Sequence, residues 1–305
     1  MIHYKKREWA THLFAVEGSM VREIVGRVTA CVGWSVVVVA AHHLLPLRLA
    51  ISPTIHTLVG VAVGLLLVFR TNASYDRFWE GRRQWGSIIN ESRNLARAVR
   101  AYVAPAAPDL ADRVLIWAAT FPYAVMNVLR EEDPGLGPPG DRLQAWEVAP
   151  VLAAPNVPLA VAVRVSEHLA EARDRGAIPD ILLPMIDANA QQLIDCYGAC
   201  ERIKKTPLPF VYVVHLRRTL VLYCFTLPLA LVDLYGWWTI LVTLFAAYMF
   251  FGIEEIGVEI ENPFGHDVND LPLESFCRTV ERDLLTPPGP SARPTPEPSA
   301  AGGPG

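Results

Sequence analysis

Residues 49–86 read LAISPTIHTLVGVAVGLLLVFRTNASYDRFWEGRRQWG, an apolar run that passes directly into a stretch rich in arginine and aromatic residues. Residues 49–69 contain no Asp, Glu, Lys or Arg, and about twenty apolar residues are what a helix needs to cross a membrane. No proline occurs between Asn72 and Tyr102. Pro53 suits a first helical turn, where its missing N–H costs nothing. We therefore expect one helix from near Pro53 to near Val103, ~75 Å long at the usual rise.

Three more segments are candidates for membrane crossings. Residues 28–47 and 234–253 are each free of charged side chains and are long enough to span the hydrocarbon core. Residues 219–232 form a shorter apolar run that follows Arg217 and Arg218, so these arginines must reach the membrane surface or the helix must begin deeper. The sequence predicts an all-α integral membrane protein with four transmembrane helices.

The positive residues beside the spans predict the orientation of the chain. Cytoplasmic loops carry the excess of Lys and Arg. The segment before the first span holds two Lys and three Arg, and the segment after the second holds seven Arg between Arg70 and Arg100, whereas the first hairpin holds only Arg48. We expect a multi-pass protein of the inner (plasma) membrane with both termini in the cytoplasm.

The predicted spans divide the chain into six parts. These are a cytoplasmic N-terminal segment (1–27), a transmembrane hairpin (28–69), a cytoplasmic helical region (70–206), a second hairpin (207–253), a cytoplasmic C-terminal helical region (254–285) and a tail (286–305). Within the central region, helices are expected at 115–130 and 181–203, and loops at 133–141 and 153–158. The tail has seven Pro and four Gly and is expected to be disordered.

Composition excludes several classes of protein. Hydrophobic residues make up 52% and charged residues 19% of the 305 residues, and the formal net charge is −4. A nucleic-acid partner is not expected, because phosphate binding needs a basic surface. The five cysteines are odd in number and lack ligand-spaced partners, so buried, reduced thiols are expected rather than disulfides or a zinc site.

One face of the second span carries a regular apolar stripe. Val61, Leu65 and Phe69 recur at i, i+4 and i+8. In a membrane helix such a stripe faces lipid, packs against another helix or lines a pore, and spacing alone favours the first two. Gly60 and Gly64 lie on a neighbouring face at a spacing that lets helices approach closely.

The segment IENPFGHDVNDLPLESF (260–276) gathers oxygen donors near a turn. Asp267, Asn269 and Asp270 lie within four residues, and such oxygens can bind Ca²⁺. The EF-hand spacing is not met, however. The favoured interpretation is a structural turn that caps the following helix, with Asp267 and Asp270 kept as weak metal candidates.

Three separated motifs together resemble the bestrophin family in its bacterial branch. They are FRTNASYDRFWEGRRQWG (69–86), ACERIKKTPLPFVYVVHLRRTLVLYC (199–224) and ENPFGHDVNDLPLE (261–274), in that order, and the similarity covers residues 10–285. The resemblance implies a homopentameric ion channel with four transmembrane helices per subunit around one axial pore. It also implies a hydrophobic neck lined by Val61, Leu65 and Phe69, and an aperture at the cytoplasmic exit carried by Ile181.

The resemblance also bears on ions and cofactors. Animal members bind Ca²⁺ through an acidic cluster after the N-P-F-G motif, but His266, Val268 and Asn269 replace acidic residues here. We therefore expect no calcium gating and no cofactor. The resemblance implies monovalent ions, with chloride expected from the family and cation selectivity as the alternative in the bacterial branch. The neutral neck gives no sign of charge selection.

Two other function classes compete with a channel. A secondary transporter would have broken spans at matching positions in two halves, but no repeat relates the halves of this chain. A membrane enzyme would use His42, His43 and His56 with the acidic loop, yet the predicted orientation puts these groups on opposite sides of the membrane. No enzymatic activity is expected, and the expected partners are further copies of the chain, the lipid bilayer and permeating ions.

Overall fold

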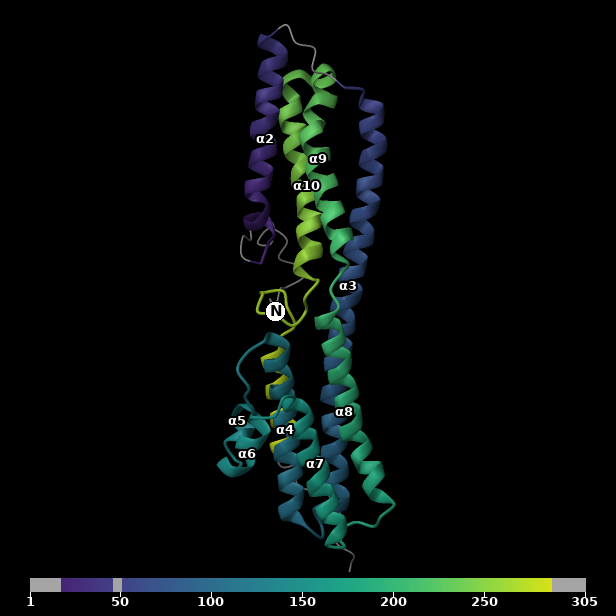
Figure 1. Ribbon diagram of the computed structural model, residues 1–305, viewed down its shortest axis with the longest axis vertical. Coiled ribbons are helices and arrows are strands. Elements are labelled where there is room, and N and C mark those ends of the chain that lie inside the picture. Colours follow the sequence, from purple (N-terminus) through teal and green to yellow (C-terminus); the bar gives the residue numbers. More distant parts are fainter. Residues whose placement is uncertain (1–17, 46–50, 287–305) are drawn as a thin grey trace, which may run out of the picture.

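The computed structural model describes residues 18–45 and 51–286, and these two ranges contain helices and no strand (Figure 1). The first elements are α2 (Val21–Leu44), α3 (Pro53–Ala98), a π-helical turn η1 (Val99–Val103), α4 (Pro108–Arg130), α5 (Gly137–Gly140) and α6 (Ala145–Leu152). They are followed by α7 (Val157–Asp174), α8 (Leu182–Lys205), α9 (Phe210–Tyr235), a 3₁₀ turn η2 (Gly236–Trp238), α10 (Thr239–Glu259) and α11 (Leu273–Leu285). Residues 287–305 of the predicted disordered tail (286–305) lie outside the described residues.

The helices form two bundles placed end to end (Figure 1). The apolar bundle consists of α2, α9, α10 and the first half of α3. The second bundle consists of the rest of α3 with α4, α7, α8 and α11, and the short helices α5 and α6 lie at its side. Each bundle has its own hydrophobic core, so the molecule is elongated along α3.

The long helix predicted from the absence of breakers is confirmed. α3 continues through η1 without interruption, so one helical stretch runs from Pro53 to Val103. Val63 and Leu67 on this helix belong to the core of the apolar bundle. Further along the same helix, Trp85 belongs to the core of the second bundle. A single helix therefore joins the two halves of the molecule.

Three helical stretches are long and apolar enough to cross a membrane, namely Val21–Leu44, Pro53–Val103 and Phe210–Glu259. The third stretch contains two helices, because the chain reverses at Gly236 and α10 returns alongside α9 (Figure 1). Gly236 has a φ of +50°, a conformation that side chains larger than hydrogen rarely adopt. α9 begins at Phe210, well before the short apolar run that was predicted to span.

Other local expectations have mixed outcomes. The helices expected at 115–130 and 181–203 are confirmed as parts of α4 and α8. The segment 133–141 was expected to be a loop, but it contains the helical turn α5, which Pro138 favours by its fixed φ. All five cysteines are buried and free, as expected.

The segment between α10 and α11 packs directly on α3. A Cβ atom on Gly81 would lie 3.0 Å from Phe264 Cε1 and 3.0 Å from Pro263 Cγ. Phe264 is fully buried in the second core. The N-P-F-G turn is therefore held against the middle of the long helix, between the two bundles.

Candidate functional site

In the apolar bundle, α3 has one buried face and one open face. The buried face carries Val63 and Leu67, which are covered by the neighbouring helices. The open face carries Val61, Leu65 and Phe69, whose exposed fractions are 68%, 55% and 56%. The stripe found in the sequence is thus an apolar surface that the rest of the described chain leaves uncovered.

Close contacts with α9 hold α3 in this orientation. A Cβ atom on Gly60 would lie 2.7 Å from the Tyr223 hydroxyl oxygen, so the glycine is what lets Tyr223 approach. Tyr212 donates a hydrogen bond from its hydroxyl to the Leu66 carbonyl oxygen at 2.8 Å. Gly64 has open space where its Cβ would be. Of the two glycines expected at a helix contact, Gly60 is therefore used and Gly64 is not.

A buried ion pair lies directly beyond the apolar stripe. Arg70, which follows Phe69, is 1% exposed, and its Nη1 lies 2.7 Å from Glu254 Oε1 on α10. In the sequence, Arg70 counts among the arginines that indicate orientation and begins a stretch of arginines and aromatic residues typical of a membrane interface, but its partner on α10 was not predicted. The available signal was Glu254 itself, the carboxylate that immediately follows the last apolar run.

The candidate aperture residue lies far from the stripe. Ile181 directly precedes α8, which begins at Leu182, and its side chain is 72% exposed. The beginning of α8 is at the end of the second bundle remote from the apolar bundle (Figure 1). The structure therefore keeps the two predicted constrictions apart along the molecule.

The acidic segment after the N-P-F-G motif makes one hydrogen bond within itself and two contacts to neighbouring parts of the chain, the end of α10 and the residues after α4. Asp270 Oδ2 accepts a hydrogen bond from the Asp267 backbone N–H at 2.8 Å. Asn269 Nδ2 donates to Glu259 Oε1 at 2.7 Å, and His266 Nε2 lies 3.0 Å from Glu132 Oε1. The expectation that this turn caps the next helix is wrong, because Pro272 occupies the capping position of α11 without a side-chain hydrogen bond.

The two weak metal candidates differ in their surroundings. Asp267 is exposed, whereas Asp270 is buried and burial raises the pKa of its carboxyl group to about 6. Within the two described ranges, no three His, Cys, Asp or Glu side chains converge as metal ligands do. The absence of a calcium response stays a prediction.

The three histidines of the rival enzyme hypothesis lie in the apolar bundle. His42 Nε2 lies 3.4 Å from Asp233 Oδ1, and the His43 ring stacks on Trp237 with centroids 5.3 Å apart. His56 stacks on Tyr223 with centroids 4.2 Å apart. The ends of α2 and α3 that carry these histidines are opposite to the end of α10 that leads into the acidic segment (Figure 1). The structure therefore does not bring the two groups together.

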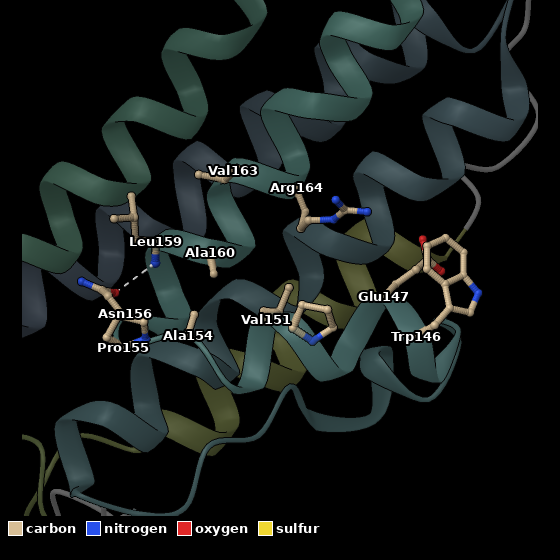
Figure 2. A pocket seen from close by; sticks show the side chains of 11 residues that line it. Trp146, Glu147, Val151, Ala154, Pro155, Asn156, Leu159, Ala160, Val163 and Arg164 are labelled. Atoms are coloured by element: carbon tan, nitrogen blue, oxygen red, sulfur yellow. Dashed lines mark hydrogen bonds between the residues drawn. The ribbon is translucent and has the colours of Figure 1, made fainter.

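An apolar groove of about 550 Å³ lies on the second bundle, between α6 and α7 (Figure 2). Figure 2 shows the Trp146 side chain at one end and Asn156 at the other, where Asn156 accepts a hydrogen bond from the Leu159 N–H. The groove contains one carboxylate, Glu147, which is buried and paired with Arg113. Its lining offers shape and apolar surface, without a nucleophile placed beside a base.

Comparisons with known proteins find one family and several relatives that match nearly the whole chain. The family described as "Bacterial/Fungal Bestrophin protein" matches residues 1–286. A voltage-dependent anion channel-forming protein of Nostoc sp. is 39% identical over 297 residues, which are 94% of this chain and 95% of that protein. A protein of the same description from Synechocystis sp. is 37% identical over 91% of each chain.

Solved structures are similar over most of the chain. The crystal structure of a bacterial bestrophin homologue from Klebsiella pneumoniae superposes with a TM-score of 0.79 and 31% sequence identity. The match covers 86% of this chain and 97% of that one.

Burial of Asp270 predicts a pH-dependent stability. Its pKa rises from the usual 3.8 to about 6, so the folded protein binds this proton more tightly than the unfolded chain. The stabilising contribution is therefore present below pH 3.8 and is lost as the pH rises through about 6. Asp270→Asn keeps an oxygen that can accept the Asp267 N–H and removes the charge. We expect the variant to be more stable at neutral pH by about 1–3 kcal/mol.

The measurement is thermal unfolding in detergent, followed by tryptophan fluorescence, at neutral pH and near pH 4. The advantage of Asp270→Asn should shrink at the lower pH, and Asp112→Asn, at an exposed aspartate on α4, serves as the matched control. An advantage of equal size at both pH values would contradict the prediction.

Proposed function

The chain belongs to the bacterial and fungal bestrophin family, and we propose that it forms a membrane channel for anions, chloride among them. The names of the relatives from Nostoc and Synechocystis support anions. The observation that carries the proposal is the open face of α3. Three large apolar side chains line this face, and the described remainder of the chain does not cover them.

In an assembly of several copies, the open face of α3 can line a central pore. We propose a homopentamer around one axis, with four membrane-spanning helices per subunit formed by α2, the first half of α3, α9 and α10. The α3 helices of the five subunits would surround the axis. The second bundle and both termini would lie in the cytoplasm of a cell whose inner membrane holds the apolar bundle.

The proposed neck works without ligands for the ion. Rings of Val61, Leu65 and Phe69 offer neither charge nor hydrogen-bonding groups, so passage depends on the radius of the neck and on whether water fills it. Hydrophobic constrictions can gate by dewetting. The proposal involves no bond chemistry.

Ile181 is proposed as the second constriction. Its side chain is exposed just before α8 at the far end of the second bundle. A ring of five such side chains would form a small apolar opening. Ions that leave the neck would pass through it before they reach the cytoplasm.

A secondary transporter remains the alternative function. Such proteins bind substrate at broken helices near the middle of the membrane. α3 runs unbroken through the apolar bundle and beyond it, which favours the channel. Pro228 interrupts the hydrogen-bond ladder of α9, but no corresponding break lies in α3.

The experiment that tests the proposed function is a reversal-potential measurement. Purified protein in planar bilayers is placed under a KCl gradient, and we expect a potential close to the equilibrium potential of chloride. A reversal potential close to the equilibrium potential of potassium would contradict anion selectivity and support a cation-selective channel. Transport without discrete single-channel currents would favour the transporter.

The neck is tested by shortening its three side chains together. Val61→Ala, Leu65→Ala and Phe69→Ala in one chain should widen and wet the constriction, and single-channel conductance should rise several-fold. The matched control replaces Leu241, Phe245 and Met249 by Ala, because these exposed apolar residues have the same spacing on α10. Equal conductance changes in both variants, or an unchanged conductance in the first, would contradict the assignment of these three residues to the neck.

Calcium independence is tested on the same channel. Val268 has no coordinating side-chain atom, His266 offers nitrogen to a hard cation, and one Asp270 oxygen is already bound to a backbone N–H. Micromolar Ca²⁺, which sensor sites detect, should therefore leave the current unchanged, and so should chelation with EGTA. A current that EGTA abolishes, Ca²⁺ restores and Asp267→Ala makes insensitive would show a working calcium site.

A further inference from the structure

One carboxylate contacts all three of the other helices of the apolar bundle. Glu254 lies on α10, and its Oε1 is 2.7 Å from Arg70 Nη1 on α3 and 3.0 Å from Arg217 Nε on α9. Its Oε2 is 3.2 Å from Arg27 Nη1 on α2. Glu254 is therefore the point at which the four helices of this bundle are connected by charge.

Arg70 depends on this carboxylate more than the other two arginines do. Arg27 and Arg217 have half-exposed side chains that water can solvate. Arg70 and Glu254 are each about 1% exposed. The second carboxylate near Arg70, on Glu261, lies at the longer distance of 3.5 Å. An unpaired charge is very costly to bury, so separating Arg70 from Glu254 would cost a large free energy.

The surface of α10 is shaped to hold the Arg70 side chain. Gly257 lies three residues after Glu254, so the two share a face of α10. A Cβ atom on Gly257 would lie 3.4 Å from Arg70 Nε and 3.6 Å from Arg70 Cδ. The Arg70 side chain therefore passes over Gly257, where α10 has no side chain, and its guanidinium group contacts the Glu254 carboxylate.

Helix geometry connects this contact to the open face of α3. Arg70 is nine residues after Val61, and at 3.6 residues per turn nine residues are about two and a half turns. The Arg70 and Val61 side chains therefore point in opposite directions from the helix axis. When Arg70 is held against α10, Val61 and Leu65 must therefore face away from the bundle, and Phe69, about 100° from Arg70, lies at the edge of the same open face.

We propose that Glu254 is a positioning residue for the neck, because it fixes the rotation of α3 about its own axis through Arg70. The inference rests on the proposed function, in which the open face of α3 lines the pore. Apolar contacts between α3 and its neighbours are non-directional and allow small rotations. The Arg70–Glu254 ion pair requires the Arg70 side chain to point at α10, so it favours one rotation of α3 about its own axis.

Stability alone does not account for such a pair. Replacing a buried ion pair by apolar residues of similar size is often neutral or stabilising, whereas removing one partner is strongly destabilising. A variant without both charges can therefore assemble and still lose the directional contact. This difference separates a positioning role from a structural one.

The experiment uses the full-length channel in bilayers and measures the rotation of α3 directly. Leu65→Cys or Leu66→Cys is introduced, and the rate at which a water-soluble methanethiosulfonate reagent changes the current is recorded. The native cysteines are buried and serve as the slow background. The two positions lie about 100° apart on the helix. In the otherwise unchanged channel, we expect fast modification at position 65 and slow modification at position 66.

Each cysteine is then combined with Glu254→Gln and, separately, with the pair Arg70→Met and Glu254→Leu. We expect modification at position 65 to slow several-fold, modification at position 66 to accelerate, and single-channel conductance to change. Glu255→Gln is the matched control, because Glu255 is the next residue on α10 and, among the residues that the structure describes, it forms an ion pair with Arg27, at 2.8 Å, and not with Arg70. It should keep both rates.

The outcomes separate this inference from the proposed function. Unchanged rates and conductance in assembled channels without the ion pair would overturn the positioning role and leave the neck in place. Loss of assembly in both charge variants would overturn it in favour of a purely structural role. If neither cysteine alters the current even with the ion pair intact, the neck assignment is wrong and the inference is overturned with it.

Discussion

The structure depends on one constraint, which is that a single unbroken helix belongs to two separate hydrophobic cores. From Pro53 to Val103 the chain makes no break, and its buried residues are shared between the apolar bundle and the second bundle. A helix that is packed at both ends can make only small rotations about its axis, because each end is held in its own core. The direction of the open apolar face is therefore fixed jointly by contacts in both bundles, and the remaining helices are arranged around that shared axis.

The boundary between the bundles is where charge replaces apolar packing. Arg70 is buried against Glu254, and two turns later Arg77 donates hydrogen bonds to backbone carbonyls at the end of α8 and after α10. Carbonyls at a helix end lack partners within the helix, and a cation there also suits the helix dipole. The arginines that indicate topology in the sequence are thus also the residues that join the second hairpin to the long helix.

Some of this architecture is readable from the sequence because it depends on local properties. The extent of the long helix follows from the absence of breakers between Pro53 and Val103, and the common face of Val61, Leu65 and Phe69 follows from spacing. Composition and local spacing cannot show which side chains far apart in the sequence come into contact. Arg217 lies inside α9, where it meets Glu254, and the openness of the stripe depends on where α9 and α10 pack. The burial of Asp270, likewise, comes from tertiary packing, which local turn signals do not encode.

The continuous helix also restricts how the chain can change in length during evolution. One residue inserted between Arg70 and Trp85 would turn one bundle by about 100° relative to the other and separate them by about 1.5 Å. Seven inserted residues, close to two whole turns, would leave a rotation of only about 20°. The same insertion would also move the bundles about 10 Å apart, so it keeps their rotation but breaks the contacts between α3 and the segment after α10. Substitutions on the surface of this part of α3 leave the relation between the two bundles unchanged, whereas a change in its residue count alters that relation.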